Sequence, residues 1–287
     1  MPGLFYGASM TVHFHGLPIW GDKGAVCKIA ITGAGAFVSY ARPEQLGLAL
    51  QHADDVAIDN AAFSAWKRGL VINWIDFYRW LMPYYHHERL KFFVIPDVVD
   101  GGEEDNDKLI RELPSMFRDK AVPVWHLHES LERLVRLCEE WPRVCFGSSG
   151  QYAVIRTKAW HQRMREAFTE IYIRRQLRTK IHGLRMLDGR IVGNFPLATA
   201  DSTNLACNVP KYEIKYPELT RTIRDADYAQ GLEPDALKRL ILRRRCAILK
   251  GAIEAVRPPS IEDWINNQPA PAGFYMGNDH ERTKMAG

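Results

Sequence analysis

Three aspartates stand where a strand would end, because Asp59, Asp97 and Asp201 each follow an apolar run. In a parallel α/β protein the carboxyl ends of the strands meet on one side of the sheet, so these carboxylates would share one face. Asp59 and Asp201 suit displacement at an anomeric carbon, one as the nucleophile and one for the proton of the leaving group. A simpler interpretation of Asp59 is a helix cap, since Asp is preferred there.

The neighbours of these acids suit a flat heterocyclic ligand. Asp97 can accept the two hydrogens that guanine presents at N1 and N2, and Phe63 can stack on a planar base. Small residues at 147–150 leave the backbone open to close approach. Core packing of Phe63 and an ordinary turn at 147–150 are equally simple interpretations. Further polar or small residues at expected strand ends are His126, His128, His182, Gly183 and Ser202.

Strand-like and helix-like segments alternate along the chain, which indicates βα units and a parallel sheet. Seven or eight units fit before the last helix, which favours an α/β fold of the (β/α)8 TIM-barrel type. No GxGxxG follows the first strand, which argues against a dinucleotide-binding fold. We expect one barrel domain over residues 1–256, irregular at its N-terminus and closed by a long helix at 233–256. A loosely held tail rich in Pro, Asn and Gly is expected at 257–287.

The expected strands are 11–15, one or two around a glycine turn at 26–40, 55–60, 92–97, 122–128, 143–150, 180–186 and 195–204. The other expected helices are 43–52, 62–89, 107–117, 130–141 and 159–178, and residues 205–232 are expected to be irregular.

Length and composition are those of a soluble globular protein with a sizeable core: 287 residues, 46% apolar and 25% charged. A net charge of +4 is compatible with a polyanionic partner. The five cysteines are widely spaced and form no CxxC, which argues against a disulfide framework or a cysteine-rich zinc site. The first ten residues do not resemble a signal peptide and no run is long enough to span a membrane, so we expect a cytoplasmic protein.

Six short segments resemble, in order and spacing, the tRNA-guanine transglycosylase superfamily, and most closely its phage-type 7-deazaguanine DNA transglycosylases. The likeness spans about residues 11–205, and its most specific parts are 59–67 and 200–204. The six segments are 58–63, 96–97, 124–126, 146–150, 181–184 and 200–203.

The resemblance implies an enzyme that exchanges a base in DNA without metal or cofactor. A guanine is flipped out of the duplex, displaced from C1′ by Asp201, and replaced by a 7-deazaguanine such as preQ0, with Asp59 as general acid/base. If the chain is phage-encoded, it works in the host cytoplasm. The residues implied to contact the base or ribose are Asn60 and Phe63 beside the ring, Asp97 at the purine edge, His126 in place of a glutamine, Gly147 and Ser148 through their backbone, and His182 and Gly183 near the ribose or the other ring face.

Two departures from the tRNA enzymes matter. Those enzymes carry a structural zinc on a Cys-x-Cys-x-x-Cys…His insertion after the nucleophile, and this sequence has no such insertion, so we expect no zinc. The insertion is associated with tRNA binding, and its absence favours double-stranded DNA as the substrate polymer, with tRNA as the alternative. Ala61 and Ala62 stand where the tRNA enzymes have glycines, which could tighten the pocket.

Base flipping requires a positive surface that holds the DNA backbone. A solvated helix face is the alternative for each basic cluster, and we favour it for 243–245. The candidate DNA-binding residues are Lys67, Arg68, Arg174, Arg175, Lys211 and Lys215, with further clusters at 178–180, 221–224 and 243–245.

A metal-dependent hydrolase of the amidohydrolase type is the main alternative function. It would require strand-end metal ligands, for which the candidates are His13, His15, His126 or His128, His182 and Asp201. No strand-end lysine is evident, and Asp59 and Asp97 would have no role. We therefore interpret His13 and His15 as an inward-facing strand pair satisfied by hydrogen bonds. A catalytically inactive nucleic-acid-binding barrel is a further alternative, against which the intact Asp59 and Asp201 argue.

Overall fold

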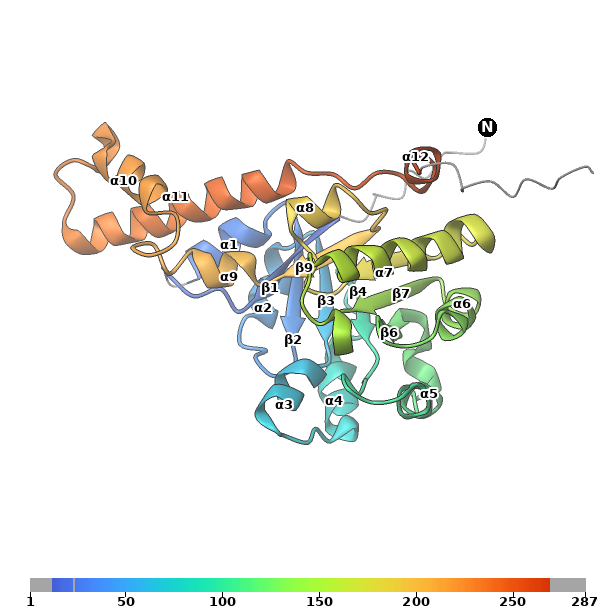
Figure 1. Cartoon of the computed structure of the whole chain (residues 1–287). Coiled ribbons are helices and arrows are strands. Elements are labelled where there is room, and N and C mark those ends of the chain that lie inside the picture. Colours follow the sequence, from blue (N-terminus) through green and yellow to red (C-terminus); the bar gives the residue numbers. More distant parts are fainter. Residues whose placement is uncertain (1–11, 23, 269–287) are drawn as a thin grey trace, which may run out of the picture.

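A nearly closed barrel of nine parallel strands forms the centre of the computed structural model, which describes residues 12–22 and 24–268 (Figure 1). The strands follow the order β5-β4-β3-β2-β1-β9-β8-β7-β6 around the sheet. Their bounds are β1 His13–Leu17, β2 Gly35–Ser39, β3 Asp55–Asp59, β4 Leu90–Val94, β5 Ala121–Val122, β6 Val124–His126, β7 Arg143–Gly147, β8 Lys180–Gly183 and β9 Thr199–Ser202.

The two end strands of this order are neighbours in the chain. Only Pro123 separates β5 from β6, and β5 pairs with β4 while β6 pairs with β7. Proline has no backbone N–H to donate to a ladder, so the strand assignment is interrupted there. Its carbonyl still accepts a hydrogen bond from the backbone N–H of Cys145 at 2.8 Å, which keeps this segment beside β7.

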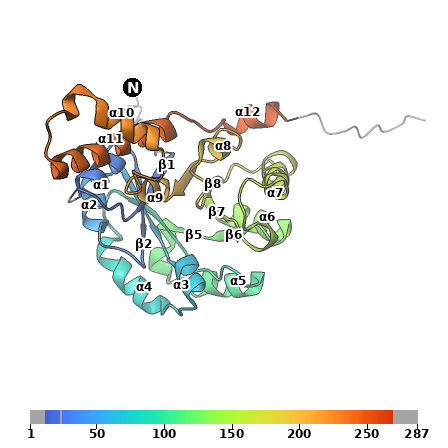
Figure 2. The same ribbon diagram turned by 60° about the vertical axis from the view of Figure 1, so that its left-hand side comes forward.

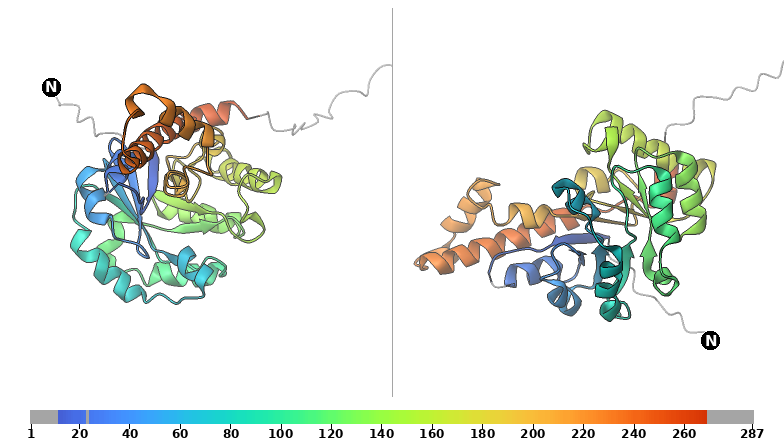
Figure 3. Two further views of the ribbon diagram at one scale, coloured as in Figure 1. Left: turned by 90° about the vertical axis from the view of Figure 1, so that its left-hand side faces the viewer. Right: turned by 90° about the horizontal axis from the view of Figure 1, so that it is seen from below.

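Helices cover the outside of the sheet, and α10 and α11 extend beyond it (Figures 2 and 3). The long helix α11 packs on α1, where the Cys246 thiol donates to the carbonyl of Val26. The helices are α1 Ala25–Ile31, α2 Leu46–His52, α3 Ala62–Arg68, α4 Trp74–Leu81, α5 Glu103–Arg111, α6 Leu131–Glu140, α7 Lys158–Phe168 followed by a π-helix Thr169–Arg174, α8 Gly189–Val192, α9 Asn204–Asn208, α10 Pro217–Asp225, α11 Pro234–Glu254 and α12 Ile261–Asn266.

Alternation along the strands divides the core into two clusters. One cluster fills the barrel and includes Phe14, Phe37, Ala57 and Phe92, whereas the larger one lies between the strands and the helices. Side chains two residues apart on a strand share a face. The residue two places after Ala57 is Asp59, so the inward face of β3 ends in a carboxylate at the open end of the barrel.

Several expected elements differ from the structure. The segment 26–40 is not a pair of strands, because residues 25–31 form α1 and only β2 is extended. A short apolar run does not show whether its residues repeat with the period of a helix or of a strand. The expected helix 62–89 is divided at Gly69, whose φ of 64° ends α3. The segment 205–232, expected to be irregular, contains α9 and α10.

The C-terminal segment after residue 256 is not loose over its described part. Ser260 accepts a hydrogen bond from the backbone N–H of Asp263 and so begins α12. Trp264 of this helix is buried, with its ring 5.7 Å from that of Phe168. Most of the expected tail, residues 269–287, lies outside the described residues, as does the start of the expected first strand at residue 11.

Candidate active site

A cavity of about 310 Å³ opens where the strands end, and all three strand-end aspartates line it. Sequence reasoning predicted Asp59, Asn60, Phe63, Asp97, His126, Gly147, Ser148 and Asp201 at this site, and each lines the cavity. The lining residues that it missed include Ser39, Arg42, Leu184 and Arg185.

Asp59 is held in a position that favours its protonated form. It lies opposite Ser39 in the register of β2 and β3, and the Ser39 hydroxyl donates to its Oδ2 at 2.8 Å. Burial raises the pKa of Asp59, and the nearby charges of Asp201 and Asp97 also raise it. These effects outweigh the lowering effect of the Ser39 hydrogen bond, and the resulting pKa is about 7. A carboxyl group with this pKa can both donate and accept a proton near neutral pH.

Asp201 has different surroundings at the end of β9. Its Oδ1 accepts a hydrogen bond from the backbone N–H of Arg185 at 2.9 Å and lies 3.3 Å from Nε2 of His182. Burial lowers the pKa of His182, so its imidazole is neutral at pH 7 and its contact with Asp201 is not an ion pair. His182 Nδ1 lies 2.7 Å from the Thr199 hydroxyl, which fixes the ring.

Asp97 is part of a buried polar cluster with Asn60 and His126. The Asn60 amide nitrogen donates to Asp97 Oδ1 and to the carbonyl of Ile95, each at 2.7 Å. The other Asp97 oxygen lies 2.9 Å from Nε2 of His126. Asn60 Oδ1 also accepts from the backbone N–H of Ala62 at the start of α3. Asn60 therefore orients Asp97 and begins the helix, in addition to facing the cavity.

Phe63 makes a cation–π contact with Arg185. The guanidinium of Arg185 lies 3.8 Å from the centre of the Phe63 ring. The same guanidinium donates to the carbonyl of Ser148 at 3.3 Å. Arg185 has a φ of 59°, in the left-handed region that an L-residue rarely adopts. The motif predicted from the sequence, 181–184, ends one residue before Arg185. The role of Arg185 becomes visible only in the structure, through its contacts with Phe63 and Ser148.

Gly147 and Ser148 lie on the cavity wall for different reasons. A Cβ on Gly147 would lie 3.0 Å from Nδ1 of His126, so a larger residue would press on the polar cluster. The Ser148 hydroxyl accepts a hydrogen bond from the indole N–H of Trp160 at 2.9 Å, and its carbonyl accepts one from the Arg185 guanidinium.

Two predicted base-contacting residues do not line the cavity. His182 lies inside the barrel, surrounded by the rings of Phe14, Phe37 and Phe92, and reaches the site only through Asp201. A Cβ on Gly183 would meet Met186 at 2.9 Å, so packing accounts for this glycine.

The predicted DNA-binding residues are spread over three regions. Lys67 and Arg68 are exposed in the last turn of α3, one to two turns after Phe63. Lys211 and Lys215 are exposed between α9 and α10. Arg174 and Arg175 form ion pairs with Glu170 and precede the first residue of β8, so they lie at the end of the barrel opposite to the cavity.

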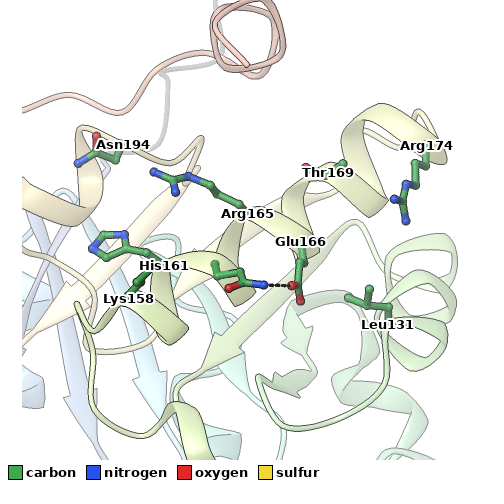
Figure 4. Close-up of a pocket in the computed structure, with 9 residues that line it drawn as sticks. Leu131, Lys158, His161, Arg165, Glu166, Thr169, Arg174 and Asn194 are labelled. Carbon is green, nitrogen blue, oxygen red and sulfur yellow. Dashed lines mark hydrogen bonds between the residues drawn. The ribbon is translucent and has the colours of Figure 1, made fainter. Parts of the chain in front are cut away.

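Arg174 lines a different hollow, a groove of about 860 Å³ on the outer side of α7 (Figure 4). The groove lies along successive turns of this helix, where Lys158, His161 and Arg165 line it and Gln162 donates to Glu166. It shares no residue with the cavity at the strand ends.

The histidines proposed for the hydrolase alternative do not converge. His13 and His15 face outward, which corrects the expected inward pair; their Nε2 atoms contact the carbonyl of Val256 at 2.9 Å and Glu254 Oε1 at 3.0 Å. His182 faces the interior of the barrel instead. Within the described part of the chain, no group of three or more His, Cys, Asp or Glu is arranged to hold a metal ion.

Comparison with protein-family models, curated proteins and solved structures finds no match. Among residues 12–22 and 24–268, no helix combines the length and apolar character needed to cross a membrane.

Proposed function

We propose that this chain is a DNA-guanine transglycosylase, a pentosyltransferase that exchanges guanine in double-stranded DNA for a 7-deazaguanine base such as preQ0. The observation that carries the proposal is the shared cavity of Asp59 and Asp201, two carboxylates from β3 and β9 with different surroundings. A buried carboxyl group with a raised pKa beside a second carboxylate is typical of an acid/base and nucleophile pair. The motif resemblance names the same two residues for these roles.

The reaction requires one proton that Asp59 can hold and return. Asp201 attacks C1′, the C1′–N9 bond breaks with inversion, and the departing guanine takes the proton of Asp59. The incoming 7-deazaguanine then gives its N9 proton to Asp59 and attacks C1′, which releases Asp201 with a second inversion. The net result is retention at C1′, and the pKa of Asp59 near 7 suits both half-reactions.

The rest of the cavity supports a purine ligand. Asp97 is oriented by Asn60 and His126, and its carboxylate faces the same space as the two catalytic candidates. Phe63 offers a ring face once the Arg185 guanidinium moves aside. We also propose that β5 and β6 function as one strand interrupted at Pro123, which makes the barrel a (β/α)8 barrel of the TIM type.

The test is incubation of the chain with radiolabelled preQ0 or guanine and, in separate reactions, duplex DNA, tRNA or neither polymer. Label is expected to enter DNA, and Asp201→Ala is expected to abolish incorporation. Asp201→Asn is the matched control for folding, since it preserves the hydrogen bond from Arg185. Label in tRNA alone would move the substrate to RNA, and incorporation by Asp201→Ala would exclude Asp201 as the nucleophile.

A further inference from the structure

A short apolar tip joins α3 to α4 and is anchored at both ends. Gly69 adopts the left-handed conformation, and the backbone N–H of Leu70 bonds to the carbonyl of Ala65 at 2.9 Å, which closes the end of α3. Asn73 accepts a hydrogen bond from the backbone N–H of Ile75 and begins α4. Only residues 70–72 lie between these two caps, so the tip is short and held from both sides.

The tip exposes large apolar side chains to solvent. Val71 is 98% exposed, Leu70 is 57% exposed, and Trp66 in the preceding turn is 48% exposed. Exposed apolar side chains that gather at one place mark an interaction site rather than a folding requirement.

The tip belongs to the helix that forms the rim of the candidate active site. Phe63 and Ser64 of α3 line the cavity, and the Trp66 ring lies 5.7 Å from that of Phe63. Lys67 and Arg68 are exposed between the rim and the tip. In Figure 1 the segment between α3 and α4 forms the lower edge of the molecule, away from α11.

We propose that Leu70 and Val71 are a wedge that enters a nucleic-acid duplex beside the nucleotide taken into the cavity. The inference rests on the proposed function and adds the means by which a paired base is extruded. Apolar side chains that insert between base pairs unstack them, and basic neighbours hold the flanking phosphates. The combination of apolar tip, adjacent cations and a purine-sized cavity fits a duplex better than a purely apolar partner.

The experiment compares Leu70→Ser/Val71→Ser with wild type on two guanine substrates, one in a duplex and one in a single strand of the same sequence. Exchange in the duplex is expected to fall by roughly tenfold or more, since the variant no longer offsets the unstacking cost. Exchange in the single strand is expected to change by less than about twofold, because no base pair has to open. Ile248→Ser is the matched control: Ile248 is 48% exposed on α11, which lies away from the tip (Figure 1).

Extrusion is also measured without chemistry. Duplex DNA with 2-aminopurine at the target position is titrated with Asp201→Asn, with and without the two tip substitutions, and the fluorescence rise on unstacking is recorded. Loss of the rise in the tip variant supports the wedge, even if no base exchange occurs on any polymer and the proposed function fails. An equal rise in both proteins, or an equal loss of exchange on paired and unpaired guanine, would overturn the wedge.

Discussion

Asp59 and Asp201 carry the same side chain, yet the residues around them differ. Asp59 is half-buried, its pKa is raised to about 7, and a serine hydroxyl is its polar partner. The Oδ1 atom of Asp201 accepts a hydrogen bond from the backbone N–H of Arg185. In the proposed reaction, Asp201 is the nucleophile and Asp59, which titrates near neutrality, moves the proton.

The raised pKa of Asp59 has a consequence for stability. Between its ordinary pKa of 3.8 and its folded pKa of about 7, the folded chain binds more protons at this site than the unfolded chain, so stability falls as pH rises through this range. Asp59→Asn removes the ionisation. We expect its melting temperature to exceed that of wild type by about 2 °C or more above pH 7.5, roughly 1 kcal/mol for a chain of this size, with the gap closing toward pH 4.5. The melting temperatures are measured by circular dichroism. A difference between Asp59→Asn and wild type that is the same at every pH would contradict the prediction.

Arg185 adds a positive charge close to both acids, and this charge favours the ionised form of Asp59. Arg185→Leu is therefore expected to raise the pKa of Asp59 and to move the corresponding limb of the pH dependence of kcat/KM to higher pH. Arg185→Lys keeps the charge and is the matched control, whose profile should stay close to that of wild type. If Arg185→Leu lowers kcat/KM at every pH but does not shift the pH at which it changes, the charge of Arg185 does not act on Asp59.

At the scale of elements, the strand that delivers Asp59 passes directly into a strained turn. Ala61 has a φ of 71°, a left-handed conformation that alanine rarely adopts. Asn60 holds the turn by accepting from the N–H of Ala62 and donating toward Asp97. The backbone strain is therefore located between Asp59 and the polar cluster of Asn60, Asp97 and His126.

Ala61→Gly is expected to stabilise the chain by about 0.5–1 kcal/mol. Glycine adopts a positive φ without steric cost, and this gain exceeds the larger loss of conformational entropy that glycine undergoes on folding. The melting temperature should rise by roughly 1–3 °C. Ala62→Gly is the matched control one residue later; it lies inside α3 and should lower the melting temperature. Destabilisation by both substitutions would show that the Ala61 methyl group contributes packing that outweighs the strain.

The elements also explain which parts of the site were predictable. Asp59, Asp97 and Asp201 follow apolar runs whose parallel pairing forces their ends together, so a local pattern was enough to locate them. Ser39 was missed because its strand was not separated from α1 in the apolar segment 26–40. Arg185 reaches the site through a left-handed residue and a contact with Phe63, and neither leaves a periodic signal in the sequence.

At the scale of the whole molecule, the position of each basic pair relative to the cavity decides which pair can hold DNA there. Lys67 and Arg68 are exposed on the helix that forms the rim, whereas Arg174 and Arg175 are paired with Glu170 at the other end of the barrel. The sequence offered both pairs as equal candidates, because charge clusters carry no information about which end of a barrel they occupy.

This difference predicts the salt dependence of DNA binding. Lys67→Ala/Arg68→Ala is expected to weaken duplex binding at low salt and to reduce the slope of log K against log salt by about 2, because two phosphate contacts no longer release counterions. Arg174→Ala/Arg175→Ala removes the same charge from the far end and should leave the slope unchanged. Both are measured by fluorescence anisotropy in Asp201→Asn, so that turnover does not alter the DNA. An equal fall in slope for the two variants would mean that the positive field of the whole chain, rather than the rim of the cavity, holds the duplex.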